Sequence, residues 1–219
     1  MIKEPNEEVE ELRQTAQFYK NSPPRKVPQY FLHTLKSVEI DGLWLEFGVW
    51  NGTSINLIAK IMMYLRQGKK PIYGFDSFEG LPEDWAHPET GEIQKEGKKG
   101  HFDMEGNFPA KESDNIVFVK GWFNETLPTF VEQHPGPVAL LHIDSDLYSS
   151  AKTIFDNLAD RIVPGTVIMF DEFYNYDGFE AHEYKAFKEF VEKYNVAYKW
   201  ITHVYDGRQA SLIIESIEV

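Results

Sequence analysis

Short apolar runs alternate along most of the chain with longer stretches in which apolar side chains recur at helical spacing. The apolar runs cover residues 43–48, 71–76, 116–119, 138–143 and 166–170. Helical spacing is found over residues 54–64, 125–133, 149–162 and 180–194. Strands that alternate with helices in this way predict a mainly parallel α/β sheet with helices on both faces.

The C-terminal end of the chain predicts two more strands, over residues 199–204 and 209–214. Asp206-Gly207 lies between them, and this dipeptide is typical of a tight hairpin turn. We therefore expect an antiparallel hairpin at the end of the sheet.

The first 38 residues predict two helices that precede the alternating pattern. Residues 4–20 are charged and helix-prone, and Ser22-Pro23-Pro24 ends that helix,. A second helix is predicted from Pro28 to Val38, and its apolar face holds Tyr30, Phe31, Leu35 and Val38,. These features predict an N-terminal helical cap at residues 1–38 and a main domain at residues 39–219.

Residues 83–114 interrupt the alternation with many charges, scattered glycines and no sustained period. A segment of this length without regular structure in a compact domain is usually a lid, a binding loop or a disordered insertion. We interpret it as a lid that becomes ordered over the bound ligands.

Composition narrows the class of protein. The chain has 219 residues, a formal charge of −13, 42% hydrophobic residues and no cysteine. The apolar content argues against disorder, and the acidic charge argues against a nucleic-acid partner. The lack of cysteine excludes disulfides and thiolate metal sites, so that any metal must bind oxygen or imidazole. Without an apolar leader or a long apolar run, we expect a cytoplasmic protein with no membrane partner.

Carboxylates stand at the ends of several predicted strands, where ligands bind in open α/β sheets. Glu46, Asp76, Asp144 and the pair Asp171-Glu172 occupy these positions. Acidic groups gathered at one edge repel one another and cost stability unless a cation binds among them. This edge is the main indication of function.

The first candidate group runs from Glu46 to Ser54 (EFGVWNGTS). Gly48 and Gly52 would let the backbone turn sharply towards a ligand, and the following helix offers free N–H groups. The segment is not a G-x-G-x-x-G motif, and its acid would suit an ammonium or sulfonium group better than a pyrophosphate. A plain tight turn explains the two glycines equally well. Asp76 could accept two hydrogen bonds from a ribose diol or could simply cap the turn at Ser77-Phe78.

The second candidate group is Asp144 with Asp171 and Glu172. If the fourth and fifth strands are neighbours, their ends lie roughly 5 Å apart and the two aspartates could share one ion. An all-oxygen ligand set favours Mg²⁺. Glu172 can join only if the strand has ended before it, because successive strand side chains point to opposite faces. Asp146 is interpreted as the N-cap of the next helix.

Histidines and aromatic residues near this edge allow two interpretations. His142 lies inside an apolar run and is interpreted as a satisfied core histidine rather than a ligand. His182 and His101 could be bases or solvated side chains. Trp50, Trp122 and Phe123 could stack on an adenine or simply pack.

Four motifs resemble the serial motifs of the macrocin O-methyltransferases, which have the class I S-adenosylmethionine-dependent fold. They are LEFGVWNGTS at 45–54, YGFDSFEGLP at 73–82, KGWFNETLP at 120–128 and HIDSDLY at 142–148. The resemblance implies a Rossmann-like, doubly wound sheet of seven strands with a reversed terminal hairpin.

The resemblance also implies roles for individual residues. It places Glu46, Gly48, Gly52 and Ser54 at the methionine end of S-adenosylmethionine, with Trp50 in the same loop as a further cofactor contact. Asp76 and Ser77 fall at the ribose, and Gly121 and Trp122 at the adenine. The Mg²⁺ ligands would be Asp144, Asp171 and Glu172, although the family often has aspartate where this chain has Glu172.

The implied reaction is attack of a substrate hydroxyl on the S-methyl group, with Mg²⁺ holding two vicinal oxygens. Asp144 is the first candidate for general base and His182 the second. The expected acceptor is a small hydroxylated sugar or polyketide-type natural product, and a homo-oligomer is possible. Two alternatives stay open: a metal-independent methyltransferase and a cofactor-binding module without catalysis.

Overall fold

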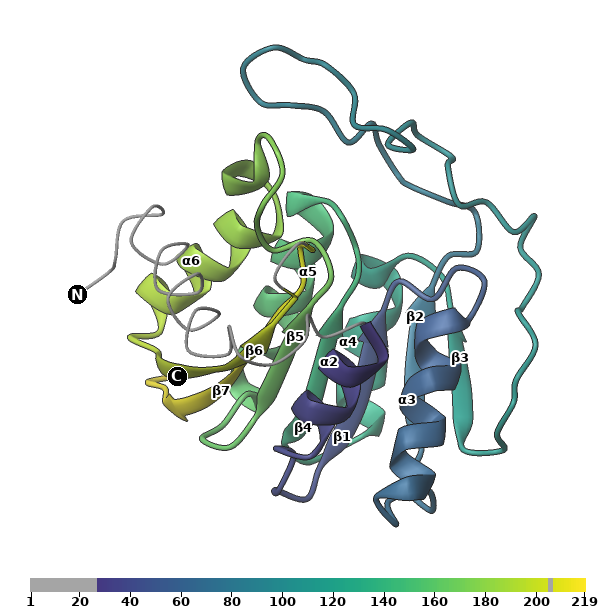
Figure 1. The fold of residues 1–219 in the computed structure, drawn as a ribbon, viewed down its shortest axis with the longest axis vertical. Coiled ribbons are helices and arrows are strands. Elements are labelled where there is room, and N and C mark those ends of the chain that lie inside the picture. The colour runs from purple at the N-terminus through teal and green to yellow at the C-terminus, as the bar shows by residue number, and fades with distance from the viewer. Residues whose placement is uncertain (1–26, 205–206) are drawn as a thin grey trace.

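The computed structural model describes residues 27–204 and 207–219. In this part of the chain the strands form one seven-stranded sheet in the order β3-β2-β1-β4-β5-β7-β6 (Figure 1). The predicted helix over residues 4–20, the Ser22-Pro23-Pro24 break and Asp206 of the hairpin lie outside the described residues.

The strands match the predicted apolar runs to within a few residues. They are β1 (Leu43–Phe47), β2 (Ile72–Asp76), β3 (Ile116–Lys120), β4 (Val138–Ile143), β5 (Val167–Phe170), β6 (Ala197–His203) and β7 (Ala210–Ser216). Strands β1 to β5 pair in parallel, whereas β7 pairs antiparallel with both β5 and β6. The mainly parallel, doubly wound α/β sheet and its antiparallel C-terminal hairpin are therefore confirmed.

The helices also follow the prediction, with shifts at their ends. They are α2 (Val27–Leu35), α3 (Thr53–Tyr64), α4 (Phe123–Gln133), α5 (Tyr148–Leu158) and α6 (Glu183–Lys193). The last turn predicted for α5 is a 3₁₀ turn at Ala159–Arg161, and the first turn predicted for α6 is a separate 3₁₀ turn at Phe179–Ala181. Tight 3₁₀ turns are common at helix ends, and sequence periodicity does not distinguish them from α-helix.

Two apolar layers hold the sheet between its helices. Leu45, Phe47, Leu141 and Ile168 belong to the layer shared with α4, α5 and α6, and Trp44, Leu140 and Met169 to the layer shared with α2 and α3. All seven side chains are at most 1% exposed. Because strand side chains alternate between faces, each central strand supplies both layers.

Helix α2 is fixed to the far side of the sheet by side-chain hydrogen bonds. The Tyr30 hydroxyl donates to the carbonyl of Ala210 at 2.7 Å and lies 3.3 Å from that of Phe170. Thr34 and Ser211 share a hydrogen bond of 2.7 Å between their hydroxyls. These buried contacts join the first described helix to β5 and β7.

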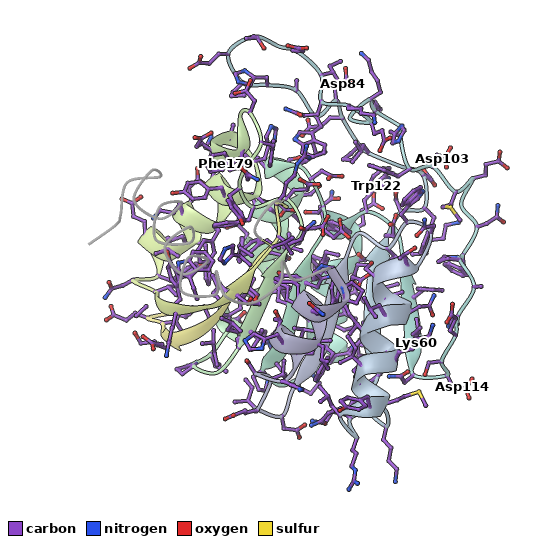
Figure 2. All side chains as sticks on the ribbon, in the orientation of Figure 1. Lys60, Asp84, Asp103, Asp114, Trp122 and Phe179 are labelled. Atoms are coloured by element: carbon purple, nitrogen blue, oxygen red, sulfur yellow. The ribbon has the colours of Figure 1, made fainter. Side chains whose placement is uncertain are left out.

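The segment 83–114 has neither helix nor strand, as predicted, apart from isolated bridges at Glu79–Asp103 and Ala86–Ile93. It rises beyond the carboxyl ends of the strands and then descends beside β3 (Figure 1). Asp84, Asp103 and Asp114 mark its course, and Lys60 of α3 faces its lower part (Figure 2). Among the described helices, none has the length and apolarity needed to span a membrane.

Candidate functional site

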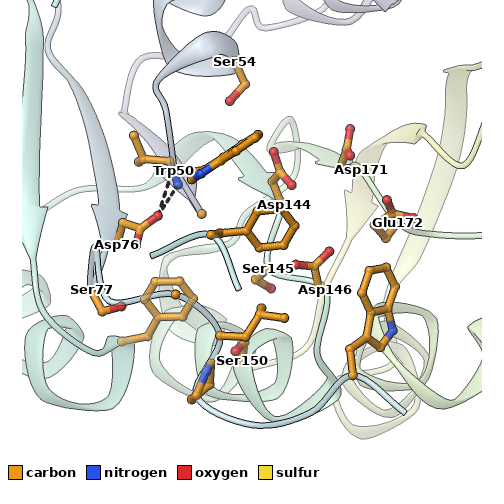
Figure 3. Close-up of a pocket in the computed structure, with 18 of the residues that line it drawn as sticks. Trp50, Ser54, Asp76, Ser77, Asp144, Ser145, Asp146, Ser150, Asp171 and Glu172 are labelled. Carbon is orange, nitrogen blue, oxygen red and sulfur yellow. Dashed lines mark hydrogen bonds between the residues drawn. The ribbon is translucent and has the colours of Figure 1, made fainter. Parts of the chain in front are cut away.

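A cavity of about 980 Å³ opens at the carboxyl ends of the parallel strands. Strands β1 and β4 are neighbours there, and the chain continues from them to opposite sides of the sheet. This switch point is where doubly wound sheets bind ligands. Of the predicted site residues, the cavity wall includes Gly48, Trp50, Ser54, Asp76, Ser77, Trp122, Asp144, Asp171 and Glu172 (Figure 3). Four others, Glu46, Gly52, Gly121 and His182, do not line it.

The glycine-containing turn after β1 is both a tight turn and part of the cavity wall. Gly48 has φ 93°, and a Cβ atom there would lie 1.7 Å from the carbonyl oxygen of Asp144. Gly52, at φ 81°, is the N-cap of α3. Only glycine allows this conformation without strain and this approach without a clash. The two interpretations of the motif are therefore compatible.

Asp76 anchors the same turn through backbone hydrogen bonds. Its Oδ2 accepts N–H bonds from Val49 and Trp50, both at 2.8 Å (Figure 3). Its Oδ1 accepts the Phe78 N–H at 2.7 Å. The proposed capping of the turn at Ser77-Phe78 is thus observed. Each carboxylate oxygen has two lone pairs, so a ribose hydroxyl could still bind at this wall position.

Glu46 lies behind the wall as the middle of a buried chain of polar groups. It is 0% exposed, accepts the Ser54 hydroxyl at 2.8 Å and lies 3.3 Å from His142 Nδ1. Glu46 and His142 are register partners on β1 and β4 and therefore share a face of the sheet,. Glu46 orients its neighbours and has no direct access to the cavity.

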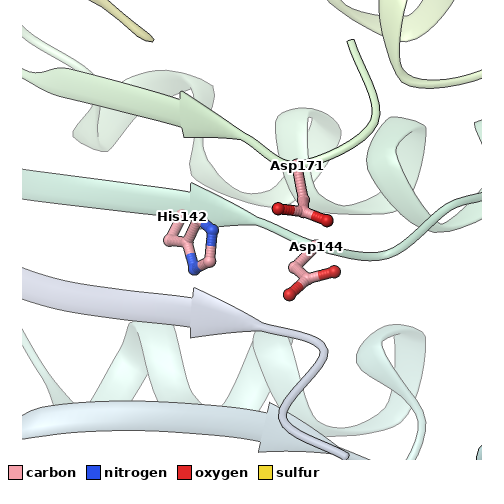
Figure 4. A group of neighbouring side chains, drawn as sticks. All are labelled: His142, Asp144 and Asp171. Carbon is pink, nitrogen blue, oxygen red and sulfur yellow. The ribbon is translucent and has the colours of Figure 1, made fainter. Parts of the chain in front are cut away.

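His142, Asp144 and Asp171 form a compact group whose possible ligand atoms all lie within 4.8 Å of one another (Figure 4). The expectation that β4 and β5 are neighbours is confirmed by their parallel pairing. His142 is buried, and its Nε2 has no hydrogen-bond partner among the described residues. The interpretation of His142 as a satisfied core histidine therefore holds for Nδ1, which faces Glu46, and is wrong for Nε2.

Within this group, the carboxyl of Asp144 is removed from water and lies close to other acids. Desolvation, followed by repulsion from Asp171 and Asp146, holds the pKa of Asp144 well above its usual range,. Such a carboxylate gains more than most from a nearby cation.

Asp146 is a wall residue and not a helix cap, so the predicted N-cap is wrong. Helix α5 starts after Leu147, which makes no side-chain capping bond. Asp146 has φ 61° and is 9% exposed, and its side chain lines the cavity. The left-handed backbone at Asp146 places it one residue too early to cap the helix. Burial, with a contribution from Asp171, raises its pKa to about 7.

Glu172 follows β5, as binding to the same ion as Asp171 would require, because the strand ends at Phe170. Its carboxylate nevertheless bonds Arg208 at 2.9 Å, and Arg208 in turn stacks over the ring of Tyr176 at 4.7 Å. Burial and Asp171 raise the pKa of Glu172 to about 8 despite this cation. The structure thus groups Asp171 with His142 and pairs Glu172 with Arg208.

Glu183, which sequence reasoning missed, binds the backbone of both acidic loops. It is 0% exposed at the first position of α6, and its Oε1 accepts N–H bonds from Ser145 at 3.0 Å and Asp146 at 3.2 Å. Its Oε2 accepts the Glu172 N–H at 3.3 Å. Burial raises the pKa of Glu183 well above normal. The only signal in the sequence was an acid amid the apolar period of a helix.

His182, the second candidate for a base, contacts the predicted lid and not the cavity. Its Nε2 lies 3.2 Å from the carbonyl oxygen of Ala86, and its ring is edge-on to Trp85. Burial lowers the pKa of His182. Trp85 itself lines the cavity and packs with Leu81 and Leu147. The segment 83–114 therefore forms part of the cavity wall.

The turn between β3 and α4 supplies another part of the cavity wall. Trp122 is the N-cap residue of α4 and lines the cavity. Gly121 has φ 138° and donates its N–H to the carbonyl of Asp76 at 3.0 Å. Gly121 therefore shapes the wall from behind.

Two curated relatives match parts of the chain. A Streptomyces olivaceus 8-demethyl-8-(2,3-dimethoxy-alpha-L-rhamnosyl)-tetracenomycin-C 4'-O-methyltransferase is 28% identical over 66% of this chain and 58% of its own length. A Streptomyces niveus demethyldecarbamoylnovobiocin O-methyltransferase is 24% identical over 77% of this chain and 65% of its own. The chain thus spans less than two thirds of the length of either relative.

Solved structures share the fold. The calicheamicin methyltransferase CalS11 superposes with a TM-score of 0.61 at 20% identity, over 97% of this chain and 94% of that one. MycE, a methyltransferase of mycinamycin biosynthesis solved with Mg, SAH and mycinamycin VI, gives 0.50 at 15% identity over 94% and 54%. Identities this low establish the class I methyltransferase architecture alone.

The family assignment rests on a match to most of the chain. The model of the macrocin-O-methyltransferase (TylF) family matches residues 28–202, which include every wall residue discussed above except Arg208. The chain belongs to the macrocin-O-methyltransferase (TylF) family.

Proposed function

We propose that this protein is an S-adenosylmethionine-dependent O-methyltransferase that acts on a hydroxyl of a sugar-bearing natural product. The observation that supports this best is that one cavity gathers the glycine turn, Asp76 and the acidic ends of β4 and β5. Family membership and the two relatives named for O-methylation of rhamnosyl and novobiocin-type compounds favour the same activity.

The cofactor would occupy the half of the cavity formed by β1, β2 and the start of α4. Gly48, Trp50 and Ser54 would face its methionine end, Asp76 and Ser77 its ribose, and Trp122 its adenine. Glu46, Gly52 and Gly121 would act from behind the wall by fixing this backbone. Trp50, 45% exposed and edge-on to Phe102 of the 83–114 segment, is free to pack on a ligand.

The other half of the cavity suits a divalent cation, for which we propose Mg²⁺ or Mn²⁺. Asp144 and Asp171 would supply oxygen. One ring nitrogen of His142 lies within 4.8 Å of their ligand atoms, and we propose its unpartnered Nε2 as the third ligand. The Nδ1 of His142 faces Glu46, an arrangement that commonly orients a metal-bound histidine,. Glu172 is the alternative third ligand if it leaves Arg208. Manganese accepts mixed oxygen and imidazole ligands more readily than magnesium does.

The residues of this chain would bind, orient and deprotonate the acceptor. S-adenosylmethionine supplies an electrophilic methyl group, and a divalent cation supplies charge that acidifies a bound hydroxyl. The acceptor oxygen attacks the methyl carbon as the C–S bond breaks, and the hydroxyl proton passes to a carboxylate of the wall. Holding the two reactants in line can contribute roughly 7–11 kcal/mol.

Two aspartates on the wall could accept that proton. Asp144 belongs to the candidate metal group, and a carboxylate oxygen bound to a cation is a poor base. Asp146 lines the same wall and is not part of that group, so its carboxylate would stay available to take a proton,. We therefore favour Asp146 over Asp144, and we assign His182 to lid docking.

We further propose that residues 83–114 are a lid with two anchor points. Its upper part docks through Ala86 on His182 and through Glu83 on Ser149. Its lower part is held on α3 by Asn56, which bonds the backbone of Ala110 and Glu112 at 2.9 and 2.8 Å. Bound cofactor and acceptor should slow proteolysis of residues 83–103, and equal cleavage with and without both ligands would contradict the lid.

The decisive experiment is a methyl-transfer assay over glycosides, catechols and polyketide alcohols, with Mg²⁺, with Mn²⁺ and in chelator. The proposal predicts transfer to a glycoside that stops in chelator. Full activity in chelator would favour the metal-independent alternative. Tight S-adenosylmethionine binding without transfer to any acceptor would favour a binding module, and no binding would contradict all three.

A further inference from the structure

We infer that Glu183 is a positioning residue that sets the spacing between the two acidic loops of the candidate metal site. This inference rests on the proposed function for its chemical meaning, although the hydrogen bonds themselves do not depend on it. Glu183 does not line the cavity, so its effect must pass through the residues that it holds.

The hydrogen bonds of the sheet position only the first residue of each loop. The pairing of β4 with β5 ends at Ile143 and Phe170, and the Asp171 N–H then donates to the Ile143 carbonyl at 3.0 Å. The Asp144 N–H likewise donates to the Phe47 carbonyl at 2.9 Å. Past these two bonds the loops leave the strands, bearing Asp146 and Glu172, and another group has to hold the loops at a fixed distance from each other.

The Glu183 carboxylate provides that link. One of its oxygens accepts the N–H groups of Ser145 and Asp146, at 3.0 and 3.2 Å, and the other accepts the N–H of Glu172, at 3.3 Å. The two oxygens of one rigid, planar group thus bind two loops that are remote in sequence. Three N–H donors suit an ionised carboxylate, which accepts several hydrogen bonds and donates none.

Burial of the Glu183 carboxylate at this position lowers the stability of the fold, which would be unfavourable if the residue had no role. A fully buried carboxylate loses its hydration, and Asp146, Asp171 and Glu172 add repulsion,. Natural proteins retain such local conflicts mainly at functional sites. A glutamine would fill the same volume without the charge, but its amide group would turn a donor towards one of the two loops.

The test compares Glu183→Gln with Glu189→Gln in the full-length protein. Glu189 lies on the same helix, and its carboxylate accepts one hydrogen bond, from the Tyr148 hydroxyl at 2.9 Å. The glutamine control therefore makes the same chemical change at a site outside the cavity. Mn²⁺ serves as the probe, because paramagnetic resonance measures its free and bound forms without turnover.

We expect Glu183→Gln to weaken Mn²⁺ binding by about tenfold or more, as is common when an orienting partner of metal ligands is lost. Its affinity for S-adenosylmethionine, measured by calorimetry, should change less than about twofold, whereas a general loss of structure would reduce both. Glu189→Gln should match the wild type in both. Equal Mn²⁺ affinity in all three proteins would overturn the inference.

Amide hydrogen exchange separates this inference from the proposed function. In Glu183→Gln, residues 144–147 and 171–173 should lose protection together, whether or not Mn²⁺ binds. If the wild type binds no Mn²⁺, the metal proposal fails, and joint loss of protection still supports the role of Glu183. Unchanged protection in both loops contradicts that role. If Glu183→Gln does not fold, Glu183→Asp, whose arm is too short to reach both loops, replaces it with the same expected result.

Discussion

The acids in the two halves of the cavity have opposite surroundings. On the β2 side, Asp76 has both oxygens bonded to backbone N–H groups, at 2.7 to 2.8 Å. On the β4 side, Asp144 lies among Asp171, Asp146 and Glu46, and loss of hydration and repulsion from these acids raise its pKa. Asp76 is stabilised by the fold itself, whereas the carboxylates of Asp144 and Asp146 have no donor among the described residues and would gain comparable compensation from a cation.

The comparison teaches that the position of an acid at a strand end does not define its task. Donors around a carboxylate make it a structural anchor that can also meet a neutral hydroxyl. Missing donors, together with an unpartnered imidazole nitrogen, characterise the half that we propose binds a cation,. The two halves should therefore fail independently when they are mutated.

Asp171→Asn should have the largest effect on activity, because it removes a proposed ligand from the half that depends on a cation. We expect methyl transfer to fall by about 100-fold or more and Mn²⁺ affinity by at least tenfold, with S-adenosylmethionine affinity unchanged. Initial rates and calorimetry measure these quantities. Asp160→Asn, at an exposed position, is the matched control. Full activity of Asp171→Asn in chelator would remove the metal from the mechanism.

Gly48→Ala should disrupt both halves of the cavity, because Gly48 in the first half packs against the backbone of Asp144 in the second. The new Cβ would lie 1.7 Å from the Asp144 carbonyl oxygen. We expect a loss of about 3 kcal/mol or more in the free energy of unfolding, from the clash added to the left-handed backbone. Gly91→Ala, at φ 69° with nothing within 4 Å of its Cβ, should lose only about 1 kcal/mol,. Equal losses in thermal unfolding would show that the close contact is unimportant.

Asp76→Asn should mirror Asp171→Asn. Asparagine has one acceptor oxygen, so the variant cannot bond both the Val49–Trp50 backbone and Phe78. We expect S-adenosylmethionine affinity to fall roughly 10- to 100-fold, which corresponds to the loss of a charge-assisted hydrogen bond, while Mn²⁺ affinity stays within about twofold. Calorimetry with each ligand separately gives both values. A parallel loss of Mn²⁺ binding would show that the two halves are coupled.

The pH dependence of stability should reveal the protonation of acids whose carboxylates lack hydrogen-bond donors, such as Asp146. Asp146 has an ordinary pKa of about 4 when unfolded and about 7 in the metal-free fold,. The folded protein then binds a proton that the unfolded chain has lost, so the stability from this group falls as the pH rises from 4 through 7. Three pKa units correspond to about 4 kcal/mol,. Relative to Asp146→Asn in chelator, the wild type should therefore lose roughly 8–16 °C in Tm over this range, at about 2–4 °C per kcal/mol. Parallel curves for the two proteins would mean that Asp146 is ionised throughout.

Glu172→Gln should have the smallest effect, because Glu172 pairs with Arg208 in place of the metal group. We expect Mn²⁺ affinity to fall by less than about threefold, far less than in Asp171→Asn. The same paramagnetic measurement serves both variants. A loss equal to that of Asp171→Asn would make Glu172, and not His142, the third ligand.

The sequence predicted the sheet well because its signals are local. Continuous apolar runs identify buried parallel strands, and Asp206-Gly207 identifies the hairpin even though its residues 205–206 are not described. Helix ends were less accurate: α2 ends at Leu35, three residues before the predicted Val38. Val38 is nevertheless buried, as its apolar character predicts.

The sequence predicted only those parts of the site that follow from the order of the strands in the sheet. Asp144 and Asp171 meet because neighbouring parallel strands end together. The rest depends on side-chain directions and long-range contacts: the bond of Glu172 to Arg208, the closeness of the His142 ring to the acids and the buried bridge at Glu183. Asp146 was assigned to a helix cap because helix propensity does not reveal a left-handed residue.

The hydroxyl of Tyr30 has a consequence for how the protein is made. Its hydrogen-bond acceptors lie 140 and 180 residues further along the chain, on β5 and β7. Closing such long loops makes folding slow, and synthesis delivers β7 last. Until β7 emerges from the ribosome, β5 is an open edge strand, and Asp171 and Glu172 lack Gln209 and Arg208,. The nascent chain can thus form the half of the cavity around β1 and β2 early, whereas the half around Asp171 and Glu172 is completed only once β7 has been made.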